Sequence, residues 1–336
     1  MYPFVYRRAD AVPDAIRAAA GGNLPPTSAP AQFIAGGTQL LDLMKLGSWT
    51  PQTLVDINGL APSLSAIEAG PKGLRLGALV RMSQLETHPT VIRDYPVIAQ
   101  TMALAASQQL RNMATLAGNI LQRTRCQYFR EADWPACNKR APGSGCAAIE
   151  GLNRKHAVLG VNDNCIASYP GDFAQALVAL GAEIDTAGEA GARTIPFEQL
   201  HTGPEDPARE TVLLPGELIT AIRVPAGPWT RRSTYLKVRD RQSYAFGLAT
   251  AAVALDLRDG VVQEARIGLG GVAYKPWRAH AAEAALRGKK LDESTAADAA
   301  RAAFAGAKTH GENAFKVELG QRTLVRALLQ AGRMEV

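Results

Sequence analysis

The segment Phe33-Ile34-Ala35-Gly36-Gly37-Thr38-Gln39-Leu40-Leu41 carries the strongest local signal for the fold. A short apolar run ends in two adjacent glycines, and an amphipathic stretch rich in leucine follows directly. This order predicts a strand, a tight turn and a helix that begins near Thr38. Paired glycines let the backbone approach a ligand and turn successive N–H groups toward it, and a helix dipole would add attraction for an anion. A plain strand-to-helix turn is the alternative.

A second candidate turn is Thr115-Leu116-Ala117-Gly118-Asn119-Ile120. It offers small residues, a hydroxyl and an amide where a pyrophosphate or a flavin edge could bind, although it too could be a plain turn. Neither segment matches a Rossmann G-x-G-x-x-G or a Walker loop. Gly268-Leu269-Gly270-Gly271-Val272-Ala273 does match G-x-G-x-x-A, but it ends a hairpin strand and Pro276 follows, so we interpret it as a strand end.

The cysteines are the other unusual feature, because all four fall within one forty-position stretch: Cys126, Cys137, Cys146 and Cys165. The loop between the second and third has almost no apolar content, unlike the surroundings of core cysteines. Four thiolates from irregular loops suit a metal ion or an iron–sulfur cluster. The gaps of ten, eight and eighteen residues are wider than those of zinc modules and fit a [4Fe–4S] cluster better. A structural zinc ion and two disulfides remain alternatives.

Composition describes an ordinary globular chain of 336 residues, with 47% hydrophobic and 20% charged residues and room for two or three domains. No apolar run approaches the length needed to span a bilayer, so we predict no membrane span. The net charge is +6, and several basic residues gather near the cysteines in sequence: Arg111, Arg123, Arg125, Arg130, Lys139 and Arg140. They indicate a solvated surface, an anionic cofactor or cluster, or an acidic partner. Nucleic acid is not predicted, because no aromatic-interleaved basic stripe occurs.

The pattern of elements predicts an α+β chain with a boundary at Pro225-Ala226-Gly227-Pro228. Beyond it, residues 246–257 and 261–269 flank Asp259-Gly260, a strong hairpin signal. Helices are then expected over about 276–287, 294–305 and 312–331. Earlier in the chain, Ser83-Gln84-Leu85-Glu86 has the pattern of a capping box that opens a helix.

A family resemblance rests on three motifs that occur in this order: Ala35-Gly36-Gly37-Thr38, Thr115-Leu116-Ala117-Gly118-Asn119, and Ser168-Tyr169-Pro170-Gly171-Asp172. Together they resemble the FAD-binding medium subunit of the xanthine dehydrogenase, or molybdenum hydroxylase, family, and the similarity covers nearly the whole chain. The cysteine segment is not general to that family. With Gln122-Arg123-Thr124-Arg125-Cys126 and the loop up to Cys146, it resembles the flavoprotein subunit of bacterial periplasmic aldehyde oxidases, which carries a [4Fe–4S] cluster.

The resemblance implies a two-part α+β fold. Residues 1–225 would form an FAD-binding domain of the vanillyl-alcohol oxidase (PCMH) type, with a [4Fe–4S] loop insertion at about 122–166. Residues 226–336 would form a smaller C-terminal domain of the CO dehydrogenase flavoprotein type, with an antiparallel sheet plus helices.

The resemblance also implies the residues that hold non-covalent FAD. The pyrophosphate would be wrapped by Ile34, Ala35, Gly36, Gly37, Thr38, Gln39, Leu40 and Leu41. The pyrophosphate and ribityl side would be met by Thr115, Ala117, Gly118 and Asn119. Asp172 would accept hydrogen bonds from ribityl or ribose hydroxyls, and the isoalloxazine ring would be bordered by Ile219 and Lys237. Ala105 replaces an aromatic residue that relatives often place near the ring. For Lys237 the alternative is a strand lysine that faces solvent.

The implied function is electron transfer without a catalytic residue set in this chain. A large partner with a molybdenum cofactor would oxidise an aldehyde, and a small partner with two [2Fe–2S] clusters would relay electrons to FAD. FAD would pass them to an external acceptor. The cluster would be bound by Cys126, Cys137, Cys146 and Cys165. All five histidines are interpreted as surface or capping residues, and His156 is the only candidate for a neighbour of the cluster. Basic residues around the cluster would hold its potential up.

Two other functions and the compartment stay open at this point. The chain could be a zinc-stabilised structural or assembly subunit in which the glycine loops are plain turns, or a self-contained flavin oxidase. Residues 1–8 are not followed by the apolar region of a secretory signal. We therefore expect a periplasmic location through co-export with a partner that bears a twin-arginine signal, with the cytoplasm as the alternative.

Overall fold

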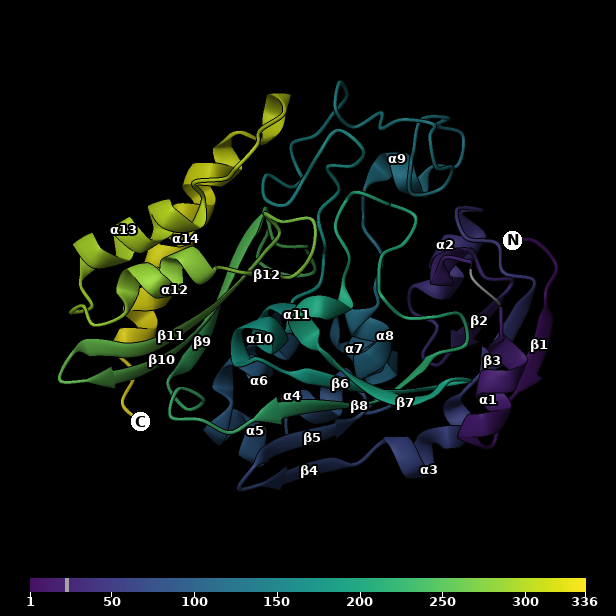
Figure 1. Ribbon diagram of the computed structural model, residues 1–336, viewed down its shortest axis with the longest axis horizontal. Helices are drawn as coiled ribbons and strands as arrows, with labels where there is room; N and C mark the ends of the chain where they lie inside the picture. The colour runs from purple at the N-terminus through teal and green to yellow at the C-terminus, as the bar shows by residue number, and fades with distance from the viewer. Residues whose placement is uncertain (22–23) are drawn as a thin grey trace.

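The computed structural model describes residues 1–21 and 24–336 of the chain (Figure 1). Its strands form three separate sheets, of three, five and four strands. Helices follow or separate the strands without a regular β-α-β alternation, which confirms the predicted α+β class. The two-part arrangement is confirmed as well, because the four-stranded antiparallel sheet and the last helices form a unit at the C-terminal end.

The first sheet is parallel, with strand order β1-β3-β2. Its strands are β1 (Val5–Arg8), β2 (Ala31–Ile34) and β3 (Thr53–Asp56). The helical segments around it are α1 (Val12–Ala19), η1 (Pro26–Ser28), α2 (Leu40–Lys45), η2 (Asn58–Leu60) and α3 (Ala61–Leu64). Helix α2 begins two residues later than predicted, because Thr38 and Gln39 form a turn and the backbone of Gln39 is not helical.

The second sheet is antiparallel, with strand order β4-β5-β8-β6-β7. Its strands are β4 (Ile67–Gly70), β5 (Gly73–Gly77), β6 (Glu183–Gly188), β7 (Gly191–Pro196) and β8 (Leu218–Pro225). The helices associated with it are α4 (Met82–Glu86), α5 (Pro89–Asp94), α6 (Pro96–Leu104), α7 (Gln108–Met113), α8 (Leu116–Ile120) and α11 (Phe197–Leu200). The capping box lies two residues earlier than predicted, because the N-cap of α4 is Arg81 rather than Ser83. The backbone N–H of Arg81 donates to the side-chain oxygen of Gln84.

Helix α10 (Phe173–Leu180) joins the two parts of the molecule, and all eight of its residues are buried. It packs against α6 and also against the third sheet. The helix ends at Gly181, whose φ of 68° is the left-handed conformation that glycine adopts readily at this position.

The third sheet is antiparallel, with order β12-β11-β10-β9. Its strands are β9 (Ser233–Val238), β10 (Ala249–Arg258), β11 (Val261–Gly270) and β12 (Trp277–Arg278). The hairpin at Asp259-Gly260 is confirmed, with positive φ values of 51° and 77° that the favoured two-residue turn requires. Strand β11 ends at Gly270, which confirms that the glycine-rich stretch there is a strand end.

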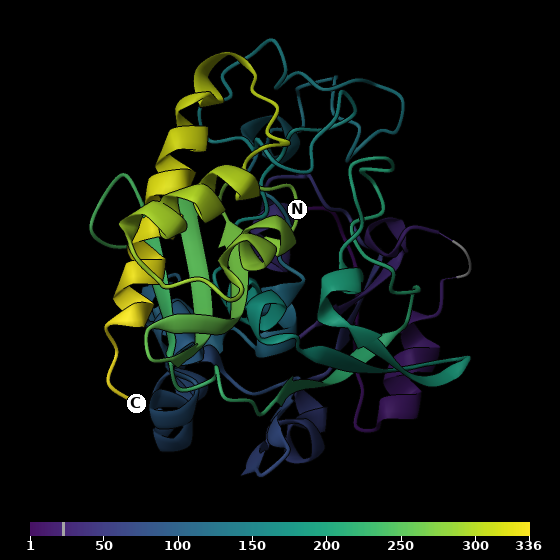
Figure 2. The same ribbon diagram turned by 60° about the vertical axis from the view of Figure 1, so that its left-hand side comes forward.

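The last helices cover one face of this sheet (Figure 2). They are α12 (His280–Leu286), α13 (Glu293–Ala303), η3 (Gly311–Asn313) and α14 (Phe315–Gly332). Alternate residues of β10 serve two cores: Ala252 and Ala254 face the α6 and α10 side, whereas Val253 and Leu255 face the last helices. No helix in the described ranges has the length and apolar content to cross a bilayer.

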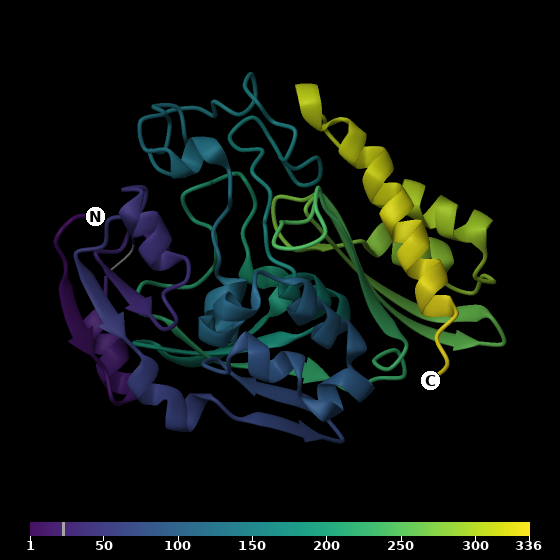
Figure 3. The ribbon, with the colours of Figure 1, turned by 180° about the vertical axis from the view of Figure 1, so that it is seen from behind.

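The cysteine segment lies between α8 and α10, and we call residues 122–166 the insertion. In residues 121–172, all of which the structure describes, α9 (Gln127–Arg130) is the only helix and no named strand occurs. Seen from behind, the insertion spans from the region of α2 to the region of α14 (Figure 3). Side chains from both ends hold it: Asp42 of α2 pairs with Arg130, and the Lys316 side chain of α14 bonds to the backbone of residues 155 and 156.

Lys316 is the least expected of these contacts, because it is fully buried at 0% exposure. Its Nζ donates to the carbonyls of Lys155, His156 and Gly271 at 3.0, 2.9 and 2.6 Å. One side chain therefore joins α14, the insertion and the end of β11.

We expect Lys316→Met to lower the free energy of unfolding by about 3 kcal/mol, because the buried carbonyls of His156 and Gly271 lose this donor. Urea denaturation of the purified protein measures this. Lys308→Met is the control, since Lys308 is exposed and bonds to the Val158 carbonyl through its backbone N–H, which the substitution keeps. Equal stability of the Lys316 variant and the wild type would contradict the proposed role as a clamp.

Candidate functional site

The glycine turn between β2 and α2 touches the second candidate turn. A β-carbon on Gly36 would lie 2.1 Å from the carbonyl oxygen of Met113 and 3.2 Å from Cα of Ala114. Only glycine permits this approach. Gly37 adopts a φ of 68°, which also favours glycine. The structure thus brings residues 34–41 and 113–119 together, as a shared ligand site requires.

The first turn also has backbone N–H groups that donate to no acceptor in the described structure. Among hydrogen bonds of the described residues, none is donated by the backbone N–H groups of Gly36, Gly37, Thr38 or Gln39. Successive free N–H groups in a turn form a concave site for an anion, which fits a pyrophosphate. The Gln39 side chain points away from the turn, because it exchanges two hydrogen bonds, of 2.9 and 2.7 Å, with the backbone of Arg123.

The second turn offers different groups. Thr115 caps α8 by accepting from the N–H of Gly118, and the N–H groups of Leu116 and Ala117 donate to backbone carbonyls of other segments. These donors are therefore already used. Asn119 remains available, because its side-chain oxygen is buried and has no hydrogen-bond partner in the described structure. This turn is suited to side-chain and van der Waals contact with a ligand rather than to an anion cradle.

Asp172 and Lys237 form a buried ion pair at 2.8 Å, with side-chain exposures of 6% and 1%. The alternative of a solvent-facing Lys237 is therefore wrong. The Tyr235 hydroxyl donates to the other oxygen of Asp172, because Tyr235 and Lys237 are two positions apart on β9 and share a face. Burial, together with the neighbouring Asp172 carboxylate, raises the pKa of Tyr235 well above its usual value, so the phenol keeps its proton.

Ala105 and Ile219 are core residues in the structure, 3% and 2% exposed, and both belong to the large core around α6 and α10. The carbonyl of Ala105 accepts from the guanidinium of Arg111. Their contact with an isoalloxazine ring stays a prediction.

The four cysteines line one cavity within the insertion, and all four are free thiols, so the disulfide alternative does not hold. Cys137 and Cys146 face each other across a short antiparallel bridge. Within residues 1–21 and 24–336, no three His, Cys, Asp or Glu side chains are placed to hold a single metal ion. The cavity is the place in the described structure where the four thiols meet.

Hydrogen-bond donors surround the sulfurs. Backbone N–H groups of Phe129 and Tyr128 reach Cys126, and those of Ile166, Ala148 and Ile149 reach Cys146. The Nε2 of His156 lies 3.2 Å from Sγ of Cys126 and the residue is buried, so the interpretation of this histidine as a surface or capping residue is wrong. Donors aimed at sulfur are typical of sites that stabilise an anionic iron–sulfur cluster.

The six basic residues near the cysteines in sequence separate in space. Arg111 pairs with Glu86, outside the cysteine cavity, while Arg125 and Arg130 pair with Asp42. Only Lys139 of the six lines the cavity. Proximity in sequence was therefore a poor guide to which cation faces the sulfurs.

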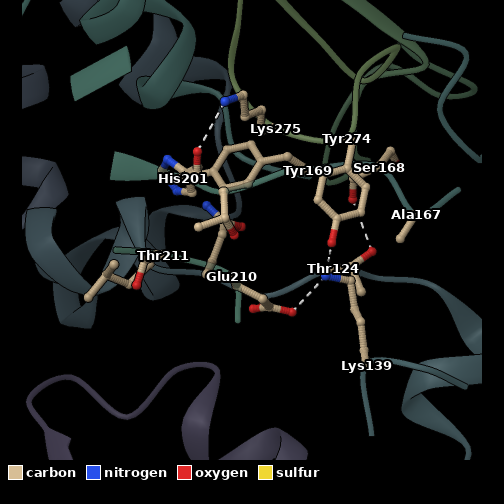
Figure 4. Close-up of a pocket in the computed structure, with 13 residues that line it drawn as sticks. Thr124, Lys139, Ala167, Ser168, Tyr169, His201, Glu210, Thr211, Tyr274 and Lys275 are labelled. Atoms are coloured by element: carbon tan, nitrogen blue, oxygen red, sulfur yellow. Dashed lines mark hydrogen bonds and ion pairs between the residues drawn. The ribbon is translucent and has the colours of Figure 1, made fainter. Parts of the chain in front are cut away.

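A polar pocket lies beside the cysteine cavity, and Lys139 borders both (Figure 4). The Nζ of Lys139 contacts Glu210 at 3.0 Å and the Tyr274 hydroxyl at 2.9 Å, and Glu210 also pairs with Arg123 at 3.1 Å. Burial opposes ionisation of Glu210, yet Arg123 and Lys139 together lower its pKa to about 2. Sequence analysis missed Glu210, because a single acid in an irregular segment carries no motif.

His201 lines the same pocket and is neutral. Its Nε2 lies 3.0 Å from the carbonyl of Ile120, the last residue of α8, so the ring donates there. Burial lowers the pKa of His201 to about 4.

Comparison with known proteins agrees with this geometry. Residues 2–227 match the family described as the FAD binding domain in molybdopterin dehydrogenase, and residues 234–331 match the CO dehydrogenase flavoprotein C-terminal domain. The chain belongs to the FAD-binding medium subunits of the xanthine dehydrogenase and CO dehydrogenase family. It is therefore an FAD-binding oxidoreductase subunit, which contradicts the alternative of a zinc-stabilised structural subunit without a redox role.

Individual relatives of this medium subunit cover nearly the whole chain. It is 48% identical to the Aldehyde oxidoreductase FAD-binding subunit PaoB of Escherichia coli, over 90% of this chain and 91% of that one. It is 28% identical to the Carbon monoxide dehydrogenase medium chain of Afipia carboxidovorans, over 86% and 82%. A solved carbon monoxide dehydrogenase from Hydrogenophaga pseudoflava is 27% identical, with a TM-score of 0.74 and 98% of each chain covered. The position of the domain boundary and the individual FAD contacts stay predictions.

We expect Gly36→Ala to weaken the affinity for FAD at least about tenfold. The added methyl group would push the turn away from Met113 and misalign the N–H groups of the turn. The measurement is the flavin-to-protein ratio after extended dialysis. Gly70→Ala is the matched control, since no atom lies within 4 Å of a β-carbon there. Full flavin content in the Gly36 variant would contradict the assignment.

We also expect His201 to make the protein sensitive to acid. An unfolded histidine titrates near 6.5 and the folded one near 4, so the unfolded state binds the extra proton between these values. Stability then falls as the pH drops from 6.5 to 4, by about 3 kcal/mol. Urea denaturation at several pH values should show a flatter profile for His201→Gln, and exposed His280→Gln should behave like the wild type.

Proposed function

We propose that this chain is the electron-transfer flavoprotein subunit of a molybdenum-containing aldehyde oxidoreductase. In this proposal FAD receives electrons from a molybdenum-bearing large subunit through the [2Fe–2S] clusters of a small subunit, and an external acceptor takes them up. The 48% identity to an aldehyde oxidoreductase FAD-binding subunit supports the reaction class. The words "medium chain" and "medium subunit" in relatives' names support an assembly of several different chains.

The proposal includes a [4Fe–4S] cluster held by Cys126, Cys137, Cys146 and Cys165. The observation that carries it is the single cavity lined by four free thiols and by N–H donors. The cavity wall packs directly on the helix after the glycine turn: Leu43 of α2 contacts Phe129 and Cys137. The proposed cluster and the FAD turn thus share a buried apolar contact.

FAD supplies two-electron storage between one-electron carriers and an acceptor. The chain's own residues position it and set the charge around it. The free N–H groups of residues 36–39 would bind the pyrophosphate, and Lys237, held by Asp172, would favour negative charge on the reduced ring. The residues offer no step of acid–base chemistry on an organic substrate, so substrate oxidation is assigned to a partner chain.

The first test is a visible spectrum of the anaerobically purified protein, with iron, sulfide and zinc assays on the same sample. Flavin bands with about four irons per chain are expected. Flavin with zinc, or with no metal, would reject the cluster and leave the family assignment intact. Aldehyde turnover by the isolated chain would contradict the electron-transfer role in favour of a self-contained oxidase.

We expect Cys165→Ser to lose most of its iron and sulfide while it keeps its flavin, because the thiolates and the FAD turn are separate sites. Asp163→Asn, an exposed change two positions away, is the control and should keep both. Unchanged iron content in the Cys165 variant would contradict the assignment of this ligand.

We also propose that the assembled complex works in the periplasm, exported folded with a partner that bears a twin-arginine signal. The resemblance of the insertion to periplasmic aldehyde oxidases supports this location, and the cytoplasm is the alternative. Fractionation of the native host decides between them, and recovery from the cytoplasm alone would reject the proposal.

A further inference from the structure

Three side chains next to the cysteine cavity, those of Lys139, Glu210 and Arg123, form a charged triad. Lys139 lines the cavity and is 8% exposed, and its Nζ donates to Glu210 at 3.0 Å, to the Tyr274 hydroxyl at 2.9 Å and to the Pro207 carbonyl at 3.4 Å. All three acceptors lie outside the insertion. The ammonium group is therefore fixed against the cavity by residues of the surrounding protein.

Glu210 holds two cations at once. Its second partner, Arg123, is 4% exposed at the side chain and contacts it at 3.1 Å. The triad therefore contains two positive charges and one negative charge. Its net charge of +1 is largely shielded from solvent, because the side chains of Arg123, Lys139 and Glu210 are 4%, 6% and 14% exposed. Low local polarisability and the absence of mobile ions make such a charge act more strongly on neighbours than an exposed one.

The other basic residues of the insertion do not have this property. Arg125 and Arg130 share the partly exposed Asp42, and Arg140 donates to backbone carbonyls that include those of Phe129 and Glu131. Arg154 pairs with Asp240, and Lys155 is exposed. None of these five residues lines the cysteine cavity. Lys139 is thus the cation best placed to respond to charge on the thiolates.

We propose that Lys139 sets the reduction potential of the group bound by the four cysteines, and that Glu210 is the positioning residue that holds Lys139 against it. The inference rests on the proposed [4Fe–4S] cluster. Reduction adds one negative charge to a cluster that is already anionic, and a fixed cation stabilises the reduced form. Lys139 therefore raises the potential, and the carboxylate of Glu210 partly offsets that rise while it keeps the ammonium in place.

The test is a potentiometric titration of the intact complex, followed by low-temperature electron paramagnetic resonance. In Lys139→Gln the side chain can still donate a hydrogen bond, but the charge is gone. At the potential where the wild-type cluster is half reduced, we expect the reduced-to-oxidised ratio to fall about tenfold, which is about 59 mV for a one-electron couple. Lys139→Arg should restore the ratio to near the wild-type value.

Glu210→Gln should shift the potential in the opposite direction. The amide oxygen of Gln can still accept from Nζ of Lys139 and keep the ammonium in place, while the negative charge beside it is removed. Arg140→Gln, one residue from Lys139 but outside the cavity, should leave it unchanged. The [2Fe–2S] signals of the partner subunit provide an internal reference that should not move in any variant. If Lys139 and Glu210 only maintained the fold, their substitution would not shift the potential of the cluster in opposite directions.

The outcomes separate this inference from the proposed function. A wild type without iron would reject the cluster itself. Full iron content with an unchanged potential in both Lys139→Gln and Glu210→Gln would overturn the inference and leave the cluster intact. If only one of these variants assembles, its result decides: the predicted shift supports the role of the triad and an unchanged potential rejects it.

Discussion

The buried ion pair between Asp172 and Lys237 is the interaction on which the arrangement of the two domains around the cofactor depends. Asp172 precedes α10 in the FAD-binding domain, and Lys237 lies on β9 of the C-terminal sheet. The ammonium also donates to the carbonyl of Leu104 at the end of α6, so it binds the first domain twice. Loss of one member of such a pair leaves an uncompensated charge in the interior and typically costs about 3–5 kcal/mol. The same contact fixes the Lys237 ammonium beside the predicted position of the flavin ring. One side chain thus joins the two domains and also places a positive charge at the predicted cofactor site.

Local signals in the sequence predicted local structure well. The hairpin at Asp259-Gly260 follows from two residues that tolerate positive φ, and the turn at Gly36-Gly37 follows from paired glycines after an apolar run. The helix that follows this turn begins later than expected, because Thr38 and Gln39 keep a non-helical turn. Element boundaries depend on such details of the first turn, which propensity alone does not resolve.

Local sequence patterns did not predict long-range relations, although the family resemblance implied that the two candidate turns meet at one FAD site. The close contact between Gly36 and Met113 joins positions that are far apart in the chain, and nothing local marks it. Arg111 and Lys139 looked equivalent as basic neighbours of the cysteines, yet one pairs with Glu86 and the other lines the cavity. Glu210 had no local signal at all. Side chains that act through partners from distant segments become visible only when the fold brings those segments together.

The insertion has little secondary structure of its own and is held by charged residues that lie outside it, three of which bind it most centrally. Asp42 binds its arginines, Glu210 binds Arg123 and Lys139, and Lys316 binds its backbone. A chain that lost residues 122–166 would keep a carboxylate on α2, a second in the segment before β8, and an ammonium buried under α14, each without its main partner. Deletion would therefore leave three unbalanced charges in separate regions. For this reason, we expect the insertion and these three residues to be inherited as one unit, gained or lost together in the history of the family.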